Sequence, residues 1–470
     1  AVLMPDSIPT QGVIIRAENG DVIRYDETGL ILRLSDKVIA DIAARLKLTP
    51  QAVTAAPVDA IPDLPDGIDL WSPRRIGDWL HFQANLPGAD SARGYRRHID
   101  GGAIVAEAQG PLLAILGLGG ARAGLGSPGP ARFRWHVLGP ADDIGAVGMG
   151  AEGEAPETPG LEPLRELTVE AALADTLLAR RRQAHLPLPL FFTRVETDTS
   201  PAASALGTGL AMANFDRALA NLQAAASRLG TTAQVLAVVL DYTLEDLTGD
   251  ATAYRDGMLA LMERITRGMA RLGLARPIFL AAFDCGTHTV TQGPALDGQW
   301  ELSWNHGDHQ LVFAAPSYAF EIDDTGRLTD RGRLQKADAL ADALLAFQTN
   351  NRWLCPTIQL AEAKGTDIRL ICEAMDPLEI AKDDPFDADR LAGFALNGVT
   401  NGATIKKVEV DKSDPKVAVL RLSKPAEGAV FVTYAHAASP GKGPYPANRG
   451  ALRDAQGRWA LPARLKLTGG

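Results

Sequence analysis

Apolar runs alternate with amphipathic helical repeats through the middle of the chain, over residues 129–349. Short apolar runs that suit buried parallel strands lie at 133–138, 188–193, 235–240, 278–283 and 311–315. Between them, apolar side chains recur every three or four residues over 212–229 and 254–272, and each repeat ends beside a glycine, Gly230 or Gly273. This alternation predicts an α/β fold with a doubly wound parallel sheet of about five strands.

The regions on either side of this segment have a different pattern. Residues 1–60 are predicted to form a small α+β docking unit, because polar and apolar residues alternate around the turn signal Asn19-Gly20 and Ser35 can cap a short helix. Residues 61–128 are interpreted as a linker and short strands, since they are rich in proline, glycine and arginine. After residue 350 the helical period disappears, and the strand-like segments predict a C-terminal β-sandwich over 350–470.

Composition and charge narrow the classes of function. The N-terminal AVLMPDSIPTQG lacks a basic and apolar signal, and no apolar run is long enough to span a membrane, so neither secretion by that route nor membrane insertion is expected. Three scattered cysteines, Cys285, Cys355 and Cys372, are too few for a disulfide framework or a zinc ribbon, which favours synthesis in the cytoplasm. A net charge of −10 disfavours nucleic-acid binding, and no cofactor is expected.

The most specific segment is 317–347, SYAFEIDDTGRLTDRGRLQKADALADALLAF. It resembles the last block of SGNH (GDSL-like) esterases, which reads approximately Asp-x-x-His-Leu-Thr-x-x-Gly before a helix. Asp324 stands at the aspartate position and Arg327 at the histidine position. A serine hydrolase needs a base whose pKa lies near neutrality, whereas an arginine side chain stays protonated and offers no lone pair. The resemblance therefore implies the frame of an SGNH hydrolase without its base.

The other blocks of this sialic-acid-esterase-like pattern are also altered. Leu138-Gly139-Pro140-Ala141-Asp142 resembles the Gly-x-Ser-x block, with Ala141 in place of the nucleophilic serine. The second block falls within 195–206, which contains no glycine, and only Asp246 matches the third block, Gln-Gly-Glu-x-Asp. Because loss of the nucleophile or the base removes most of a triad's rate, the resemblance implies a non-catalytic domain with vestigial positions at Ala141, Asp246, Asp324 and Arg327.

An active enzyme with an unusual residue set is the main alternative. Asp284-Cys285-Gly286-Thr287-His288 places a thiol, an acid and an imidazole after a predicted strand, and Ser200 is a second candidate nucleophile. A nucleophilic cysteine needs a base held within hydrogen-bond reach, and residues three apart in a loop need not face one another. An ordinary loop is therefore favoured over a carbohydrate O-acetylesterase that uses Ser200 or Cys285.

A polar, aromatic loop precedes the last predicted strand of the α/β region. Its candidates for ligand binding, together with the tyrosine that follows the strand, are Trp304, His306, Asp308, His309 and Tyr318. The spacing fits no zinc signature, so no metal site is predicted. An aromatic ring can stack on the apolar face of a sugar, which favours a glycan contact, with ordinary packing as the alternative.

The C-terminal run RGALRDAQGRWALPARLKL resembles the β-sandwich that follows such domains in alphaproteobacterial phage-like particle proteins. The resemblance implies a non-catalytic head spike or fibre, of a tailed phage or a gene transfer agent, that binds host capsular polysaccharide. It implies assembly in the cytoplasm into a virion as a symmetric homo-oligomer, docked through the N-terminal unit on a capsid, spike-base or tail protein. A purely structural virion protein is the third possibility.

Overall fold

The computed structural model describes residues 70–87, 89, 92–142, 153–199, 202–246 and 250–469, together with three strands before residue 33. The helix predicted after Ser35 lies outside the described residues. Two compact units divide the chain: residues 1–109 with 177–189, and residues 110–176 with 190–470. No helix within the described ranges is long and apolar enough to cross a membrane.

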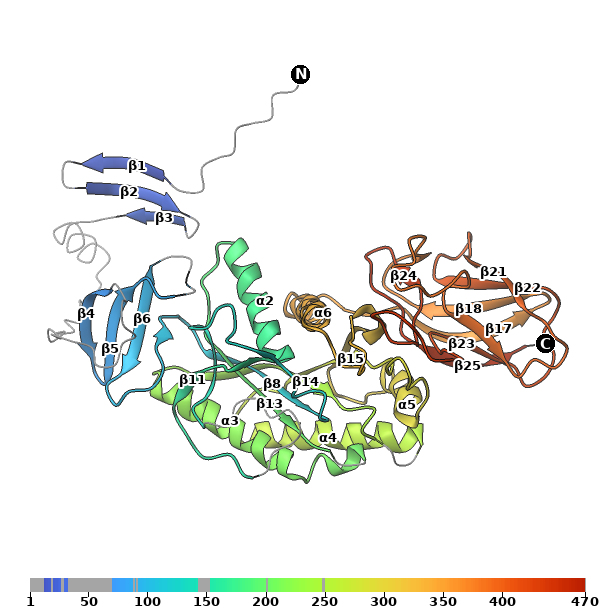
Figure 1. Cartoon of the computed structure of the whole chain (residues 1–470), viewed down its shortest axis with the longest axis horizontal. Helices are drawn as coiled ribbons and strands as arrows, with labels where there is room; N and C mark the ends of the chain where they lie inside the picture. The colour runs from blue at the N-terminus through green and yellow to red at the C-terminus, as the bar shows by residue number, and fades with distance from the viewer. Residues whose placement is uncertain are drawn as a thin grey trace, which may run out of the picture. The chain divides into compact units, whose positions relative to one another are not determined.

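The first unit contains two antiparallel sheets. β1 (Gly12–Ala17), β2 (Gly20–Asp26) and β3 (Gly29–Leu32) form one of them, and Ala17 pairs with Gly20, as the turn signal at Asn19-Gly20 predicts. The other is a four-stranded sheet in sequence order: β4 (Leu70–Ile76), β5 (Trp79–Ala84), β6 (Arg93–His98) and β7 (Val105–Ala106). Both sheets are labelled in Figure 1.

The second unit begins with a sheet of seven strands in the order β11-β10-β13-β8-β14-β15-β16. Its strands are β8 (Leu112–Gly119), β10 (Val137–Pro140), β11 (Leu161–Pro163), β13 (Phe191–Thr197), β14 (Ala233–Asp241), β15 (Ile278–Phe283) and β16 (Leu311–Pro316). All neighbours pair in parallel except β10 and β11. Without the edge strands β10 and β11, the chain order across the sheet is 2-1-3-4-5, a doubly wound arrangement.

The sequence interpretation missed β8, which is the first strand of this sheet and lies at its centre. Residues 133–136 form a turn instead of the predicted first strand, and only the short strand β10, next to the edge strand β11, follows them. The glycines inside β8 explain why it was missed, because glycine within an apolar run normally argues against a strand. Here they admit close neighbours: a Cβ on Gly117 would lie 2.2 Å from Glu170 Oε1, and one on Gly119 would lie 2.2 Å from the Asp241 carbonyl oxygen.

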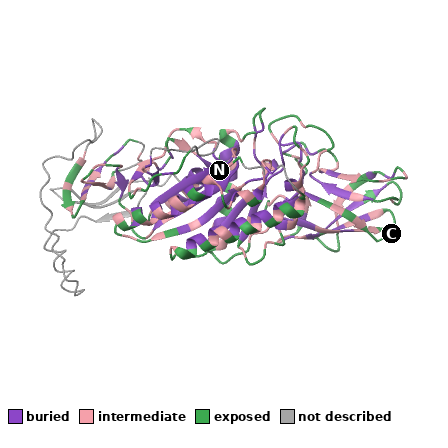
Figure 2. Ribbon diagram, turned by 90° about the horizontal axis from the view of Figure 1, so that it is seen from below, coloured by how far each residue is buried: buried purple, intermediate pink, exposed green. Residues whose placement is uncertain are grey.

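Helices cover both faces of this sheet. α2 (Val169–Gln183) and α6 (Asp330–Gln348) lie on one face, and α3 (Leu210–Arg228) and α4 (Ala251–Arg271) lie on the other (Figure 1). The predicted helical repeats are thus α3 and α4. Gly230 and Gly273 follow them with φ of +72° and +69°, the left-handed conformation that favours glycine after a helix. The strands between the helices form the buried core (Figure 2).

The described residues after α6 are all-β, as the loss of helical period predicts. Seven strands follow the order β20-β23-β25-β17-β18-β22-β21, and β19 pairs with β24. Their bounds are β17 (Thr357–Lys364), β18 (Asp367–Glu373), β19 (Leu378–Ile380), β20 (Phe394–Asn397), β21 (Ile405–Val410), β22 (Val417–Leu422), β23 (Phe431–Tyr434), β24 (Leu452–Asp454) and β25 (Ala463–Thr468). β25 joins the strands into one order, since it pairs with both β17 and β23.

Candidate functional site

A pocket of about 630 Å³, which includes open solvent at its mouth, lies where β8, β14, β15 and β16 end. The polar residues that line this strand-end pocket are Arg122, Asp241, Asp284, Ser317, Arg327, Arg333 and Lys336. Open α/β sheets bind ligands beyond the carboxyl ends of their strands, so this is where chemistry is expected. None of the described residues that line it is a histidine.

The turn after β8 places Arg122 at the pocket. Gly120 donates its backbone N–H to the carbonyl of Asp241 at 2.9 Å, and a Cβ on Gly120 would lie 2.0 Å from the Cδ of Glu245. Only glycine allows so close an approach. In the resembled hydrolases the nucleophile follows the first strand of the sheet, which here is β8. That turn, residues 119–125, reads GGARAGL, with Ala121 beside Arg122 and no serine, threonine or cysteine.

Ala141, which the sequence interpretation placed at the nucleophile position, lies elsewhere in the fold. It follows β10, the strand between β11 and β13, and does not line the strand-end pocket. Its N–H donates to the carbonyl of Gly160 at 3.0 Å, and the neighbouring Asp142 lies 3.4 Å from Arg194. The sequence interpretation missed β8 and took the apolar run 133–138 as the first strand of the sheet.

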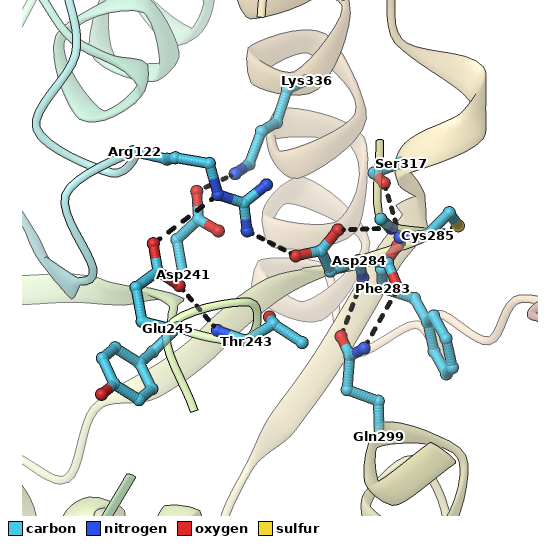
Figure 3. Close-up of polar contacts among 12 residues, drawn as sticks. Arg122, Asp241, Thr243, Glu245, Phe283, Asp284, Cys285, Gln299, Ser317 and Lys336 are labelled. Atoms are coloured by element: carbon cyan, nitrogen blue, oxygen red, sulfur yellow. Dashed lines mark hydrogen bonds and ion pairs between the residues drawn. The ribbon is translucent and has the colours of Figure 1, made fainter. Parts of the chain in front are cut away.

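Ion pairs fill the strand-end pocket (Figure 3). Arg122 Nη2 lies 2.6 Å from Asp284 Oδ2, and its Nε lies 3.6 Å from Glu245 Oε1. Lys336 Nζ, from α6, lies 2.6 Å from Asp241 Oδ2. Burial opposes the charge of Arg122, but the carboxylates of Asp284, Asp241 and Glu245 outweigh it and raise the pKa of Arg122.

Asp241 is held ionised in the same way. Burial alone would raise its pKa, but the cations of Lys336 and Arg122 lower it. Within the pocket, Arg122 is thus engaged by Asp284 and Glu245, and Lys336 is engaged by Asp241. These contacts commit the charged side chains at the ends of β14 and β15 to partners within the protein.

Glu170, in the first turn of α2, lies close to this charged group and behaves differently. Its side chain is buried against Gly117, and Oε2 has no hydrogen-bond partner within the part of the chain that the structure describes. Burial raises the pKa of Glu170 to about 7, although a hydrogen bond from Thr168 and the charge of Lys336 oppose the shift. This carboxyl is therefore partly protonated at neutral pH.

The segment from Asp323 to Thr329 keeps the shape of a loop that leads into a helix. Asp323 Oδ1 accepts from the backbone N–H of Thr325 at 2.8 Å and of Arg327 at 3.0 Å. Thr329 caps α6 by accepting from the N–H of Gly332 at 3.0 Å. Asp323 therefore orders the loop, whereas its neighbour Asp324 is exposed. Arg327 is exposed as well and lines the pocket.

The alternative nucleophiles gain no support. Cys285 is 1% exposed, its Sγ donates to the carbonyl of Phe283 at 3.4 Å, and burial raises its pKa to about 12. The thiol thus stays protonated, and a protonated thiol is a poor nucleophile. Ser200 lies outside the described residues. Asp246 is buried and accepts from the N–H of Ala203 at 2.9 Å, so it orders the turn after β13.

The structure separates the predicted ligand-binding residues. Trp304, His306, Asp308 and His309 lie in the loop before β16, whereas Tyr318 follows the opposite end of that strand. Tyr318 is fully buried, and its hydroxyl lies 2.7 Å from the Ala460 carbonyl and 3.0 Å from the Tyr434 hydroxyl. It fixes the α/β region to the β-rich region, so its prediction as a glycan contact was wrong. Across the described ranges, no cluster of three His, Cys, Asp or Glu side chains could hold a metal.

Sequence reasoning missed three charged residues of the pocket, Arg122, Asp241 and Lys336, and the buried Glu170 close to them. A signal for two of them was present, because Asp241 ends one apolar run and Arg122 follows a glycine pair that ends another. Lys336 could not be found this way, since it reaches the strand ends from a helix that starts well after β16.

No protein-family model and no curated protein matches the chain. The structure is similar to that of a carbohydrate acetylesterase from Xanthomonas citri, with a TM-score of 0.52 and 14% sequence identity over 80% of this chain and 85% of that one. At this identity the likeness shows the fold alone. Matches to the S-layer protein SbsC have a TM-score of 0.18 at 13–17% identity, cover 30–46% of this chain and 17–38% of those chains, and carry no argument. The chain thus has a mixed α/β fold of the kind found in a carbohydrate esterase.

Proposed function

We propose that this protein is a non-catalytic member of the SGNH type that binds carbohydrate and does not hydrolyse it. The observation that carries the loss of catalysis is the turn after β8, where Ala121 stands beside an arginine engaged by two carboxylates. An attacking oxygen and a neutral base are both needed for acyl transfer. Arg327 at the histidine position of the last block supports the same conclusion.

Binding of carbohydrate rests on the esterase-like fold, because the solved structure it resembles is that of a carbohydrate acetylesterase. A fold alone implies no activity, so the substrate class is carried over only as a proposal. We further propose the particle role that the sequence resemblance implies: a head spike or fibre of a phage-like particle such as a gene transfer agent. In that role it binds host capsular polysaccharide as a symmetric homo-oligomer docked on a capsid, spike-base or tail protein, after synthesis in the cytoplasm.

The catalytic part is tested by acetate release from acetylated xylan and by hydrolysis of p-nitrophenyl acetate. The purified full chain is expected to release nothing above the buffer blank, with an active carbohydrate acetylesterase as the positive control. Saturable hydrolysis that is lost on Cys285→Ala or Ser200→Ala would overturn the proposal in favour of an active O-acetylesterase.

The particle role needs a separate measurement. Particles made by a strain that lacks this chain are expected to lose an appendage in electron micrographs and to adsorb less to encapsulated host cells. Loss of the appendage with unchanged adsorption would instead indicate a purely structural virion protein.

A further inference from the structure

A second hollow, far larger than the strand-end pocket, lies at the opposite end of β16. It measures about 1500 Å³ with its open solvent included, and its walls come from the loop before β16, from the segment after α6 and from β17 and β18. We call it the aromatic groove and define it by Trp304, Asn350, Asn351, Arg352, Trp353 and Glu373. All of its walls belong to the same compact unit.

We propose that the aromatic groove binds a segment of uncharged oligosaccharide. This inference rests on the proposed carbohydrate binding and assigns its location and its charge class. The strand-end pocket is the place where an esterase would hold its substrate, yet there Arg122 and Lys336 are each engaged by a carboxylate. The aromatic groove offers a ring surface and exposed polar side chains instead.

Trp304 supplies an exposed and braced ring. Its side chain is 44% exposed, and it meets Trp300 edge to face with ring centroids 5.4 Å apart. Trp300 is itself anchored, because its Nε1–H donates to the carbonyl of Ile358 on β17 at 3.0 Å. An indole held in place loses little conformational freedom when a sugar ring stacks on it.

Trp353 lies in the segment after α6, and two contacts fix its ring. Its Nε1–H donates to the carbonyl of Ala314 on β16 at 3.0 Å, and the guanidinium carbon of Arg458 lies 5.5 Å from its ring centroid. Trp353 therefore uses its N–H to bond the backbone, as Trp300 does, which leaves its ring surface as the group it can offer to a ligand.

Planar polar groups accompany these rings. Asn350 and Asn351 are exposed after the end of α6, and Asn350 has a φ of +56°, a left-handed conformation that asparagine tolerates. Asn351 donates from Nδ2 to Thr349 Oγ1 at 3.0 Å. Arg352 and Glu373 form an exposed ion pair. Amide, guanidinium and carboxylate groups can each bond two neighbouring hydroxyls of a sugar.

Two histidines of the groove have unused ring nitrogens. The buried Nδ1 atoms of His306 and His309 have no hydrogen-bond partner among the residues that the structure describes. Burial, with Arg276 nearby, lowers the pKa of His309 and favours its neutral imidazole. Because these nitrogens are buried, His306 and His309 line the wall of the groove without presenting Nδ1 to solvent.

The charge of the lining favours an uncharged ligand. Arg352 and Glu373 are the only Arg, Lys, Asp or Glu among the described lining residues, so their formal charges cancel. The strand-end pocket differs, since Arg122, Arg327, Arg333 and Lys336 face only Asp241 and Asp284 in its lining, a formal excess of two positive charges. An acidic glycan would be attracted to the pocket, and a neutral one has no such preference.

The test is a glycan array that holds neutral and uronic-acid-containing oligosaccharides, probed with the full chain, followed by calorimetric titration with the best neutral ligand. Trp304→Ala is expected to weaken that affinity about tenfold or more, since it removes the stacking surface. Trp71→Ala is the matched control, because Trp71 is 42% exposed but belongs to the other compact unit. Arg327→Ala controls for the strand-end pocket. Thermal melting checks that each variant is folded.

The outcomes separate this inference from the proposed function. Neutral glycan binding that Trp304→Ala weakens and both controls leave intact supports the groove. Glycan binding that Arg327→Ala abolishes and Trp304→Ala leaves unchanged, or binding restricted to uronic-acid glycans, overturns the groove but leaves carbohydrate binding standing. No binding to any glycan on the array overturns both.

Discussion

The strand-end pocket and the aromatic groove use their polar side chains in opposite ways. In the pocket, Arg122 and Lys336 are each within 2.6 Å of a carboxylate oxygen, and the lysine is almost fully buried. In the groove, Arg352 and Glu373 pair while remaining largely open to solvent, and the asparagines beside them are exposed. Separating paired charges inside a protein is costly because one charge is left buried without its partner, whereas exposed polar groups remain available to a ligand. The comparison shows that one end of the sheet commits its charged side chains to internal partners, while the groove at the other end leaves polar side chains exposed.

The largest expected effect comes from breaking the buried pair of the pocket. Lys336→Met leaves Asp241 without its closest cation, which should lower the free energy of unfolding by about 3 kcal/mol. Urea unfolding followed by circular dichroism measures it. The double variant Lys336→Met with Asp241→Asn should recover part of the loss, because no uncompensated charge remains. A loss below about 1 kcal/mol in the single variant would contradict a structural role for this pair.

A comparable effect is expected from pH, through Glu170. Its pKa is raised from 4.5 to about 7 on folding, so between these values the folded state holds a proton that the unfolded state releases. Stability should therefore fall as pH rises through this window and then level off, by about 3 kcal/mol in all. In Glu170→Gln the side chain at position 170 cannot titrate, so the fall in the free energy of unfolding over this pH window should be smaller by that amount. Identical pH profiles for the two proteins would rule out this assignment.

A small effect is expected from the pair in the groove. Arg352→Ala removes an ion pair whose side chains are 66% and 40% exposed, so the free energy of unfolding should change by less than about 1 kcal/mol. Urea unfolding beside Lys336→Met gives the direct comparison between the two regions. A loss as large as that of Lys336→Met would mean that the groove, like the pocket, is built for stability.

The proposed loss of catalysis predicts no effect from placing a serine at position 121 and a histidine at position 327. Ala121→Ser with Arg327→His should hydrolyse p-nitrophenyl acetate no faster than the original chain, because Arg122 stays engaged beside the new serine and position 327 lies on an exposed loop. Hydrolysis that rises well above background and follows the titration of a histidine would show that the pocket keeps more of an active site than its ion pairs indicate.

Local patterns were enough to predict much of the α/β region. The runs 235–240, 278–283 and 311–315 fall within β14, β15 and β16, and the helical repeats before Gly230 and Gly273 are α3 and α4. Each of these elements carries its own periodicity, since a buried strand or an amphipathic helix places its apolar residues where the core lies. The strands after residue 350 were predicted for the same reason.

The sequence by itself determined the residue types, above all Arg327, because a guanidinium stays protonated whatever its surroundings. Only the tertiary structure decided which residues follow the central strand of the sheet. That answer depends on β8 lying at the centre of the sheet, where Gly117 and Gly119 make room for Glu170 and Asp241 from distant segments. Such close approaches leave no local period, so the sequence showed neither that Ala121 follows the central strand nor that Tyr318 is buried. The groove around Trp304 also depends on tertiary structure, because its walls meet only when β16, α6 and β17 pack together.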